Sequence, residues 1–399
     1  MARPFVIAHV SDLHVSTFGD TFHDRLRIVS RSKNLADTDA SRWEPVWHEA
    51  GWRVLHRKGK KVSDIELIDP EGYSHKVPSR REVASEDPVE RATFVARRLE
   101  ARRSKTLAAD VPSLAALDRL AEATPKNTNV RLLRAAHSID PDVDAVVITG
   151  DLTDDGAGYE VVSAAFARFR DRGRLFAVPG NHDLYMFPLA GSGRPKPSPD
   201  SKRASWQSFA RSLGLVVDAS GAWVRSLPEA SLVLVGLDSC SRPQRRFFRH
   251  NGAIGPAQSA YLRHIATQPE FRAARHRVVL LHHHVVPLPH GVGGRTPSEI
   301  GMRLDDAESV AQLFDELGIT CVLHGHRHVS EERKPAGAKF RIFAGSSFTL
   351  GCRSGDEPSY WRIELGERVH GERVYTGTPA VAGASVVSLE DDGEPDLES

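Results

Sequence analysis

Residues 175–183 read LFAVPGNHD, an apolar run followed by a glycine and three polar residues. The run Leu175–Pro179 has the length and composition of a buried strand, and Gly180 provides a turn that ends it. Asn181, His182 and Asp183 follow directly. A buried strand that delivers polar side chains at its carboxyl end predicts a site at one edge of a sheet.

Other apolar runs repeat this arrangement along the chain. Four of them lead into polar residues: Phe5–Val10 into Asp12 and His14, Val143–Thr149 into Asp151, Arg277–Leu281 into His282-His283-His284, and Ile319–Leu323 into His324, His326 and His328. Two more predicted strands are Leu232–Leu237 and Phe340–Ala344. Helical patterns separate the strands, at Glu160–Arg172, Ser205–Leu213, Pro256–Ala266 and Asp306–Leu317. Strands that alternate with helices predict an α/β fold.

Two regions depart from this alternation. Residues 30–129 contain no comparable buried strand, so we interpret them as an inserted cap or subdomain that interrupts a catalytic domain spanning residues 1–378. Within it we expect a polar hairpin (Trp52–Lys60 and Asp64–Val77) and helices at Pro88–Arg103 and Leu114–Ala123. Residues 379–399 end in an acidic stretch that predicts a disordered tail.

The composition excludes several classes of protein. The formal net charge of the 399 residues is +1, which gives no electrostatic sign of a protein that binds nucleic acid or membranes. The three cysteines are too few and too widely spaced for a disulfide framework, and the N-terminal apolar run is too short for a signal peptide. We therefore expect a cytoplasmic protein.

The polar residues at the strand ends are of types that bind metal ions. Carboxylates, an amide oxygen and imidazoles without thiolates suit Mn, Fe, Zn or Co. Seven such groups exceed the needs of one ion but fit two ions that share a bridging carboxylate. Any one of these histidines is better explained as a structural residue, and His9, His283 and His324 are interpreted that way. The complete set has no such explanation, because clustered buried charges need a cation.

In their order along the chain, these motifs resemble the calcineurin-like metallophosphoesterases: Asp-x-His, Gly-Asp, Gly-Asn-His-Asp, a His after a strand, and Gly-His-x-His. The resemblance covers about residues 3–24 and 143–351. It implies a fold of two mixed β-sheets packed as a sandwich, with helices on both outer faces. It also implies two divalent or mixed-valence metal ions and in-line attack on phosphorus by a hydroxide that bridges them.

Carried over by motif, the resemblance implies a role for each matching residue. One metal ion would be held by Asp12, His14, Asp151 and His328, and the other by Asp151, Asn181, His282 and His326. His182 would stabilise the transition state or protonate the leaving oxygen, and Asp183 would orient His182. Relatives usually read His-His-Pro-Pro where this chain has a His triplet, which leaves His284 as an alternative to His282.

The subfamily and the substrate follow from further segments. Leu237-Asp238-Ser239 and Gly255-Pro256-Ala257-Gln258 resemble class III cyclic-nucleotide and glycerophosphodiester phosphodiesterases, which implies a small phosphodiester substrate. A phosphomonoesterase, a nuclease and a non-catalytic scaffold with a vestigial metal site are the alternatives. Members of that class often dimerise, so a homo-oligomer is an open alternative to a monomer.

Substrate specificity is expected from outside the metal ligands. Arg242, Arg245 and His250 follow the Leu232–Leu237 strand, where they can hold phosphate or a base. An exposed basic loop explains the same residues equally well. The arginine pairs of the insert, such as Arg97–Arg98, are better explained as a solvated helix face, because acidic residues are interspersed among them.

Overall fold

The computed structural model describes residues 3–16, 19, 43–61, 64–70, 74–75, 77–107, 114–125, 127–154, 156–185, 199–240, 251–286, 302–351 and 356–377. Arg242, Arg245, His250 and the predicted tail lie outside these ranges. Among the described helices, none is long and apolar enough to cross a membrane.

All seven apolar runs form strands at the predicted places. They are β1 (Phe5–Val10), β6 (Ala145–Thr149), β7 (Leu175–Val178), β9 (Leu232–Gly236), β10 (His276–Leu280), β11 (Cys321–His324) and β13 (Arg341–Ala344). The predicted helix at Glu160–Arg172 is divided into α5 (Tyr159–Ala165) and α6 (Ala167–Arg170), because Phe166 leaves the helical conformation (φ −108°, ψ 22°). The other three predicted helices correspond to α8 (Pro199–Ser212), α9 (Gly255–Ile265) and α11 (Ala307–Glu316).

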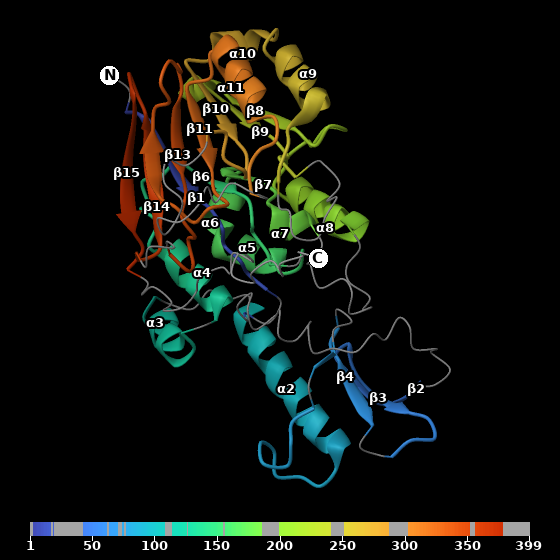
Figure 1. The fold of residues 1–399 in the computed structure, drawn as a ribbon. Helices are drawn as coiled ribbons and strands as arrows, with labels where there is room; N and C mark the ends of the chain where they lie inside the picture. Colours follow the sequence, from blue (N-terminus) through green and yellow to red (C-terminus); the bar gives the residue numbers. More distant parts are fainter. Residues whose placement is uncertain are drawn as a thin grey trace, which may run out of the picture.

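The strands form two mixed sheets. The first has the order β15-β14-β1-β6-β7, in which β1, β6 and β7 are parallel and β14 (Ser359–Leu365) pairs antiparallel with both β1 and β15 (Val369–Tyr375). The second has the order β12-β13-β11-β10-β9-β8, with an antiparallel edge strand on each side, β12 (Glu331–Arg333) and β8 (Trp223–Leu227). The predicted pair of mixed sheets is thus confirmed (Figure 1).

Successive side chains of each strand point to opposite faces of the second sheet, and both faces are buried. Leu234 and Leu280 belong to the same core as Val6 and Val146 of the first sheet, so these faces pack together. The intervening residues, such as Val235, pack with the helices α9, α10 (Pro269–Ala273) and α11 in a second core. Helix α4 (Thr128–His137) and the α5–α6 pair add apolar side chains to the first core.

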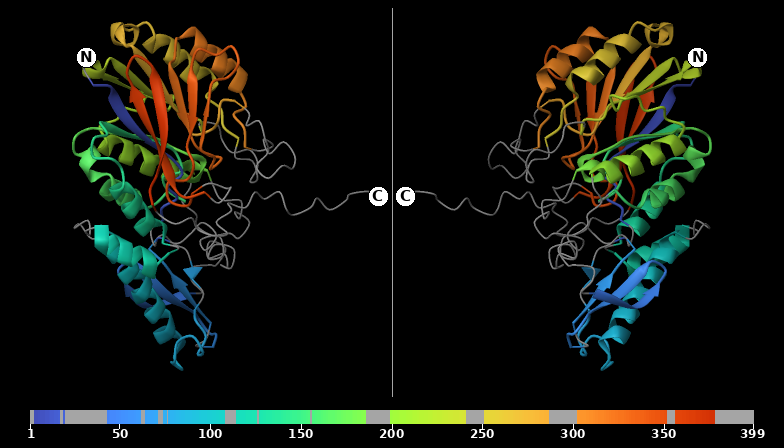
Figure 2. Two further views of the ribbon diagram at one scale, coloured as in Figure 1. Left: turned by 90° about the vertical axis from the view of Figure 1, so that its left-hand side faces the viewer. Right: turned by 90° about the vertical axis from the view of Figure 1, so that its right-hand side faces the viewer.

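The insert forms a small unit with its own core. Its strands β2 (Trp43–Glu49), β3 (Trp52–Arg57), β4 (Ile65–Ile68) and β5 (Ser74–His75) make an antiparallel sheet that packs on α2 (Pro88–Leu107). The predicted hairpin is therefore part of a larger sheet, which also contains β2 and has two strands within Asp64–Val77. Helix α3 (Leu114–Ala123) occupies the predicted residues. Figure 2 shows β2–β4 and α2 at one end of the molecule, away from the two large sheets.

Candidate metal centre

The predicted ligands meet where the two sheets present the carboxyl ends of their central strands. Asp12 and His14 follow β1, Asp151 follows β6, and His282 follows β10. Asn181 and His182 open the short helix α7 (Asn181–Leu184) after β7, and His326 and His328 follow β11. The seven predicted ligands are 0–4% exposed. The fold therefore brings residues as far apart as 12 and 328 into one buried cluster.

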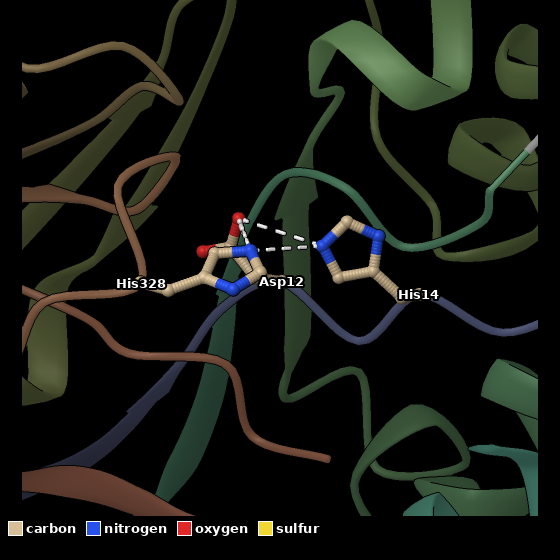
Figure 3. A group of neighbouring side chains, drawn as sticks. All are labelled: Asp12, His14 and His328. Atoms are coloured by element: carbon tan, nitrogen blue, oxygen red, sulfur yellow. Dashed lines mark hydrogen bonds and ion pairs between the residues drawn. The ribbon is translucent and has the colours of Figure 1, made fainter. Parts of the chain in front are cut away.

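Asp12, His14 and His328 form the first group (Figure 3). The Nε2 atoms of His14 and His328 lie 3.0 Å apart, and His328 Nε2 lies 3.3 Å from Asp12 Oδ1. One potential ligand atom from each of the three residues lies within 4.8 Å of the others. These three side chains can therefore bind a single ion.

Asp151, His282 and His326 form a second group, with Asn181 beside them. His282 Nε2 lies 2.9 Å from Asn181 Oδ1, 3.3 Å from Asp151 Oδ2 and 3.1 Å from His326 Nδ1. A third group, His14, Asp151 and His182, overlaps both of the others. Asp151 is thus a member of the second and third groups, and the third group shares His14 with the first.

The chemistry of this cluster fits two metal ions. In two places a pair of imidazole nitrogens approaches to about 3 Å, between His14 and His328 and between His282 and His326. A cation can accept lone pairs from both rings at once, and it also offsets the buried negative charge of Asp12 and Asp151. The site is therefore suited to metal ions that prefer nitrogen and oxygen ligands.

The backbone of the ligands is unusual. Asp12, His14, Asp151, His326 and His328 all have positive φ, between 49° and 75°. Only two other non-glycine residues in the described part of the chain share this conformation. Because a positive φ is unfavourable for residues with a side chain and clusters at functional sites, the fold is holding these ligands in place against local preference.

Two motif glycines leave room for the carboxylates. A Cβ atom at Gly180 would lie 2.2 Å from Asp151 Oδ1, and one at Gly325 would lie 2.4 Å from Asp12 Oδ2. Both distances are far inside van der Waals contact. The glycines of Gly-Asn-His-Asp and Gly-His-x-His are thus required by the close approach of the backbone to the ligands.

Other groups fix which ring nitrogen faces the centre. His14 Nδ1 lies 2.8 Å from Asp154 Oδ1, and His282 Nδ1 lies 2.8 Å from the Thr149 carbonyl oxygen. In His326 the roles are reversed, because Nε2 lies 3.1 Å from the Met302 carbonyl oxygen and Nδ1 faces His282. Such partners set the tautomer and orientation of a histidine ligand.

The Asp183 carboxylate lies among hydrogen-bond donors from two loops. Its carboxylate accepts hydrogen bonds from the backbone N–H groups of Leu152, Thr153 and Gly180, and from the Tyr159 hydroxyl. Asp183 therefore joins the loops after β6 and β7. Asp154 is the carboxylate beside His182, with 3.6 Å between Asp154 Oδ1 and His182 Nδ1.

The three histidines after β10 take separate positions. His282 is the member of the triplet that falls in a metal-binding group of the described residues. His283 Nδ1 lies 2.8 Å from the Ser239 hydroxyl oxygen, and the ring of His284 stacks on His326 with 6.3 Å between centroids. The geometry therefore favours His282 over His284 as the ligand.

Electrostatics in the cluster keep two of its imidazoles protonated at neutral pH as long as no cation is bound. Burial opposes a charged His14, but the hydrogen bond and charge of Asp154 raise its pKa to about 9. Burial likewise opposes a charged His282, yet the charge and hydrogen bond of Asp151 raise its pKa to about 9. Burial and the neighbouring His283 hold the pKa of His326 well below its ordinary value. A metal ion must displace protons from His14 and His282 but not from His326.

Comparison with known proteins agrees with this geometry. Residues 111–330, slightly more than half of the chain, match the profile of the calcineurin-like phosphoesterases. The chain therefore belongs to the calcineurin-like phosphoesterase family. It is a metal-dependent phosphoesterase that acts on phosphate esters.

Two solved phosphatase structures resemble the chain at low sequence identity. A dimetal phosphatase from Danio rerio shares 12% identity with a TM-score of 0.42, and the match covers 94% of this chain and 98% of that chain. A purple acid phosphatase from yellow lupin, Lupinus luteus, also shares 12% identity with a TM-score of 0.42, over 63% of this chain and 48% of that one. No curated protein sequence matches the chain significantly.

Proposed function

We propose that this phosphoesterase hydrolyses a small phosphodiester of the cyclic-nucleotide or glycerophosphodiester type, using two metal ions. Asp12, His14, Asp151 and His328 would hold one ion, and Asp151, Asn181, His282 and His326 the other. The observation that carries this proposal is the position of Asp151 in two of the three overlapping groups. Mn, Fe, Zn and Co are the ions that such nitrogen and oxygen ligands suit.

When bound, the ions would supply a nucleophile from water at neutral pH and offset the charge that builds up on phosphorus. The protein's own contribution lies in His182, whose backbone N–H donates to Asp151 Oδ1 at 2.8 Å. This hydrogen bond places the imidazole at the centre, where it can protonate the leaving oxygen. Asp154 lies beside the same ring, with 3.6 Å between its Oδ1 and His182 Nδ1.

A contact between two motif segments supports a diester as the substrate. Gln258 accepts a hydrogen bond from the Asp238 backbone N–H at 2.9 Å and donates to its carbonyl oxygen at 2.8 Å. The two segments that resemble class III phosphodiesterases therefore form one unit next to the centre. We also propose that the enzyme is cytoplasmic, because its three cysteines are too few and too widely spaced for a disulfide framework.

The proposal is tested by comparing diesters with monoesters on protein loaded with Mn²⁺. Bis(p-nitrophenyl) phosphate, cyclic nucleotides and glycerophosphodiesters should be cleaved with higher kcat/KM than p-nitrophenyl phosphate. A higher rate on the monoester would make the enzyme a phosphomonoesterase. Cleavage of DNA or RNA ends with strong salt dependence would make it a nuclease. Protein that binds fewer than two ions per chain and cleaves none of these would be a scaffold.

A further inference from the structure

Helix α8 lies against the segment that carries Asn181 and His182. The Lys202 ammonium, which is buried, donates to the carbonyl oxygens of His182 at 2.9 Å and Tyr185 at 2.7 Å. These two hydrogen bonds span the end of α7. The first turns of α8 are therefore fixed beside the catalytic loop, and Arg203 follows Lys202 directly.

Arg203 reaches from α8 to the end of β9. Its Nη1 donates to Asp238 Oδ2 at 2.8 Å, and the Asp238 side chain is 1% exposed. Asp238 is held in turn, because its Oδ1 accepts from the Cys240 backbone N–H at 2.8 Å. A well-fixed buried carboxylate thus sets the direction of the guanidinium.

The end of β9 adjoins the metal centre. The hydroxyl oxygen of Ser239, next to Asp238, accepts from the backbone N–H groups of His282 at 3.3 Å and His283 at 3.1 Å. Arg203 consequently lies between the elements that carry His182 and His282, outside the metal-binding groups.

Arg203 also keeps donors available to a ligand. A guanidinium has five N–H donors, and the pair with Asp238 uses Nη1 only. The Arg203 side chain is 38% exposed, in contrast to Asp238 and Lys202, which are buried. An arginine held by a buried carboxylate and still open to solvent is prepared to bind an oxyanion, and its fork geometry suits phosphate.

We propose that Arg203 is a substrate-binding residue that holds a second phosphate group of the substrate, next to the phosphate that is hydrolysed. This inference rests on the proposed phosphoesterase function and narrows its substrate to small phosphodiesters that carry a second phosphate group. Asp238 is the positioning residue, because it fixes the guanidinium without occupying all its donors.

The test measures binding rather than turnover, so it can fail separately from the proposed function. AMP and α,β-methylene-ADP are titrated calorimetrically into the Mn²⁺-loaded enzyme. In the wild type the second phosphate should tighten binding by about tenfold or more, which is the range of a charge-assisted hydrogen bond. In Arg203→Met this advantage should fall to less than about twofold, and Arg203→Lys should restore part of it. AMP should bind the wild type and Arg203→Met alike.

Two controls separate ligand binding from structural damage. Arg211→Met removes an exposed arginine from the same helix and should leave both affinities unchanged. The double variant Arg203→Met/Asp238→Asn removes the buried charge that Arg203→Met alone would leave without its partner. If Arg203 binds phosphate, the double variant will also bind α,β-methylene-ADP no more tightly than AMP. The inference is overturned if the double variant binds α,β-methylene-ADP more tightly than AMP, as the wild type does. It is also overturned if Arg203→Met keeps this difference in affinity.

Discussion

The Nδ1 atom of His14 lies 2.8 Å from Oδ1 of Asp154, and both residues are buried. The same carboxylate oxygen lies 3.6 Å from Nδ1 of His182. One carboxylate therefore orients a metal ligand and also stands beside the proposed general acid. Its removal should affect both metal binding and catalysis.

Asp154→Ala is expected to weaken metal binding and to lower kcat by about 10- to 100-fold, the usual effect of losing the partner of a histidine ligand. Asp154→Asn should be milder, because its amide oxygen can still accept from Nδ1 of His14. Metal titration and steady-state kinetics provide the measurements. Equal kcat values for wild type and Asp154→Ala at saturating metal would contradict a role for Asp154 in catalysis.

Asp151→Ala should reduce turnover more than the loss of Asp154, by well over about 100-fold. The reason is that Asp151 lies in two of the metal-binding groups and its loss would weaken both proposed sites. Metal content by mass spectrometry should fall below two ions per chain. Asp144→Ala, a change of the same kind at a residue that pairs with Arg3 at the opposite end of β6, serves as the control. Near-normal turnover by Asp151→Ala would mean that the site has been misplaced.

His182→Ala should lower kcat by about 10²- to 10⁴-fold, as expected for loss of a general acid. KM and the metal content should change little, because the ligands proposed for both ions remain. The effect should shrink for esters with good leaving groups, since p-nitrophenolate needs less protonation than an alkoxide. A uniform loss across leaving groups would instead assign His182 to stabilising charge on phosphorus.

Metal affinity is expected to rise with pH. Coordination needs neutral imidazoles, and His14 and His282 have pKa values raised to about 9. Between pH 7 and 9 each ion must displace one proton, so its apparent Kd should fall by about tenfold per pH unit and level off above pH 9. Competition with a chelator of known affinity across this range measures the slope. A Kd that is independent of pH would contradict the assigned ligands.

Stability without metal should show the opposite trend. A pKa raised above that of the unfolded chain contributes stability that is complete below about pH 6.5, the ordinary value for histidine. For His14 and His282 this contribution should disappear as the pH rises through about 9. Thermal unfolding of chelator-treated protein should therefore occur at a lower temperature at pH 9 than at pH 7. Added Mn²⁺ should reverse the difference, because the ions replace the protons.

Much of the centre of the fold can be predicted because its strands are buried on both faces. Runs such as Leu232–Gly236 are continuously apolar, a pattern typical of central parallel strands. The edge strands give no such signal. In β14 the exposed face carries Arg362 and Glu364, and β15 is mostly polar, so neither resembles a buried strand. Helix α4 was also missed, although Asn127 caps it.

In the candidate site, too, some residues can be predicted from the sequence and others cannot. Its ligands follow apolar runs in recognisable motifs, so residues as distant as Asp12 and His328 can be named from sequence. Supporting contacts depend on how loops fold and carry no motif of their own. The sequence does not reveal that Asp154, rather than Asp183, lies beside His182, or that the Met302 carbonyl oxygen orients His326.

The insert leaves and rejoins the core at almost the same point. The Thr128 backbone N–H donates to the Gly19 carbonyl oxygen at 3.0 Å, and the Asn129 side chain pairs with both backbone groups of Ser16. Because entry and exit are already joined, the core places no demand on the length of the chain between them. Evolution can thus lengthen, shorten or exchange this segment as a cassette while Asp12 and His14 keep their positions, and a protein engineer can do the same by grafting at residues 19 and 128.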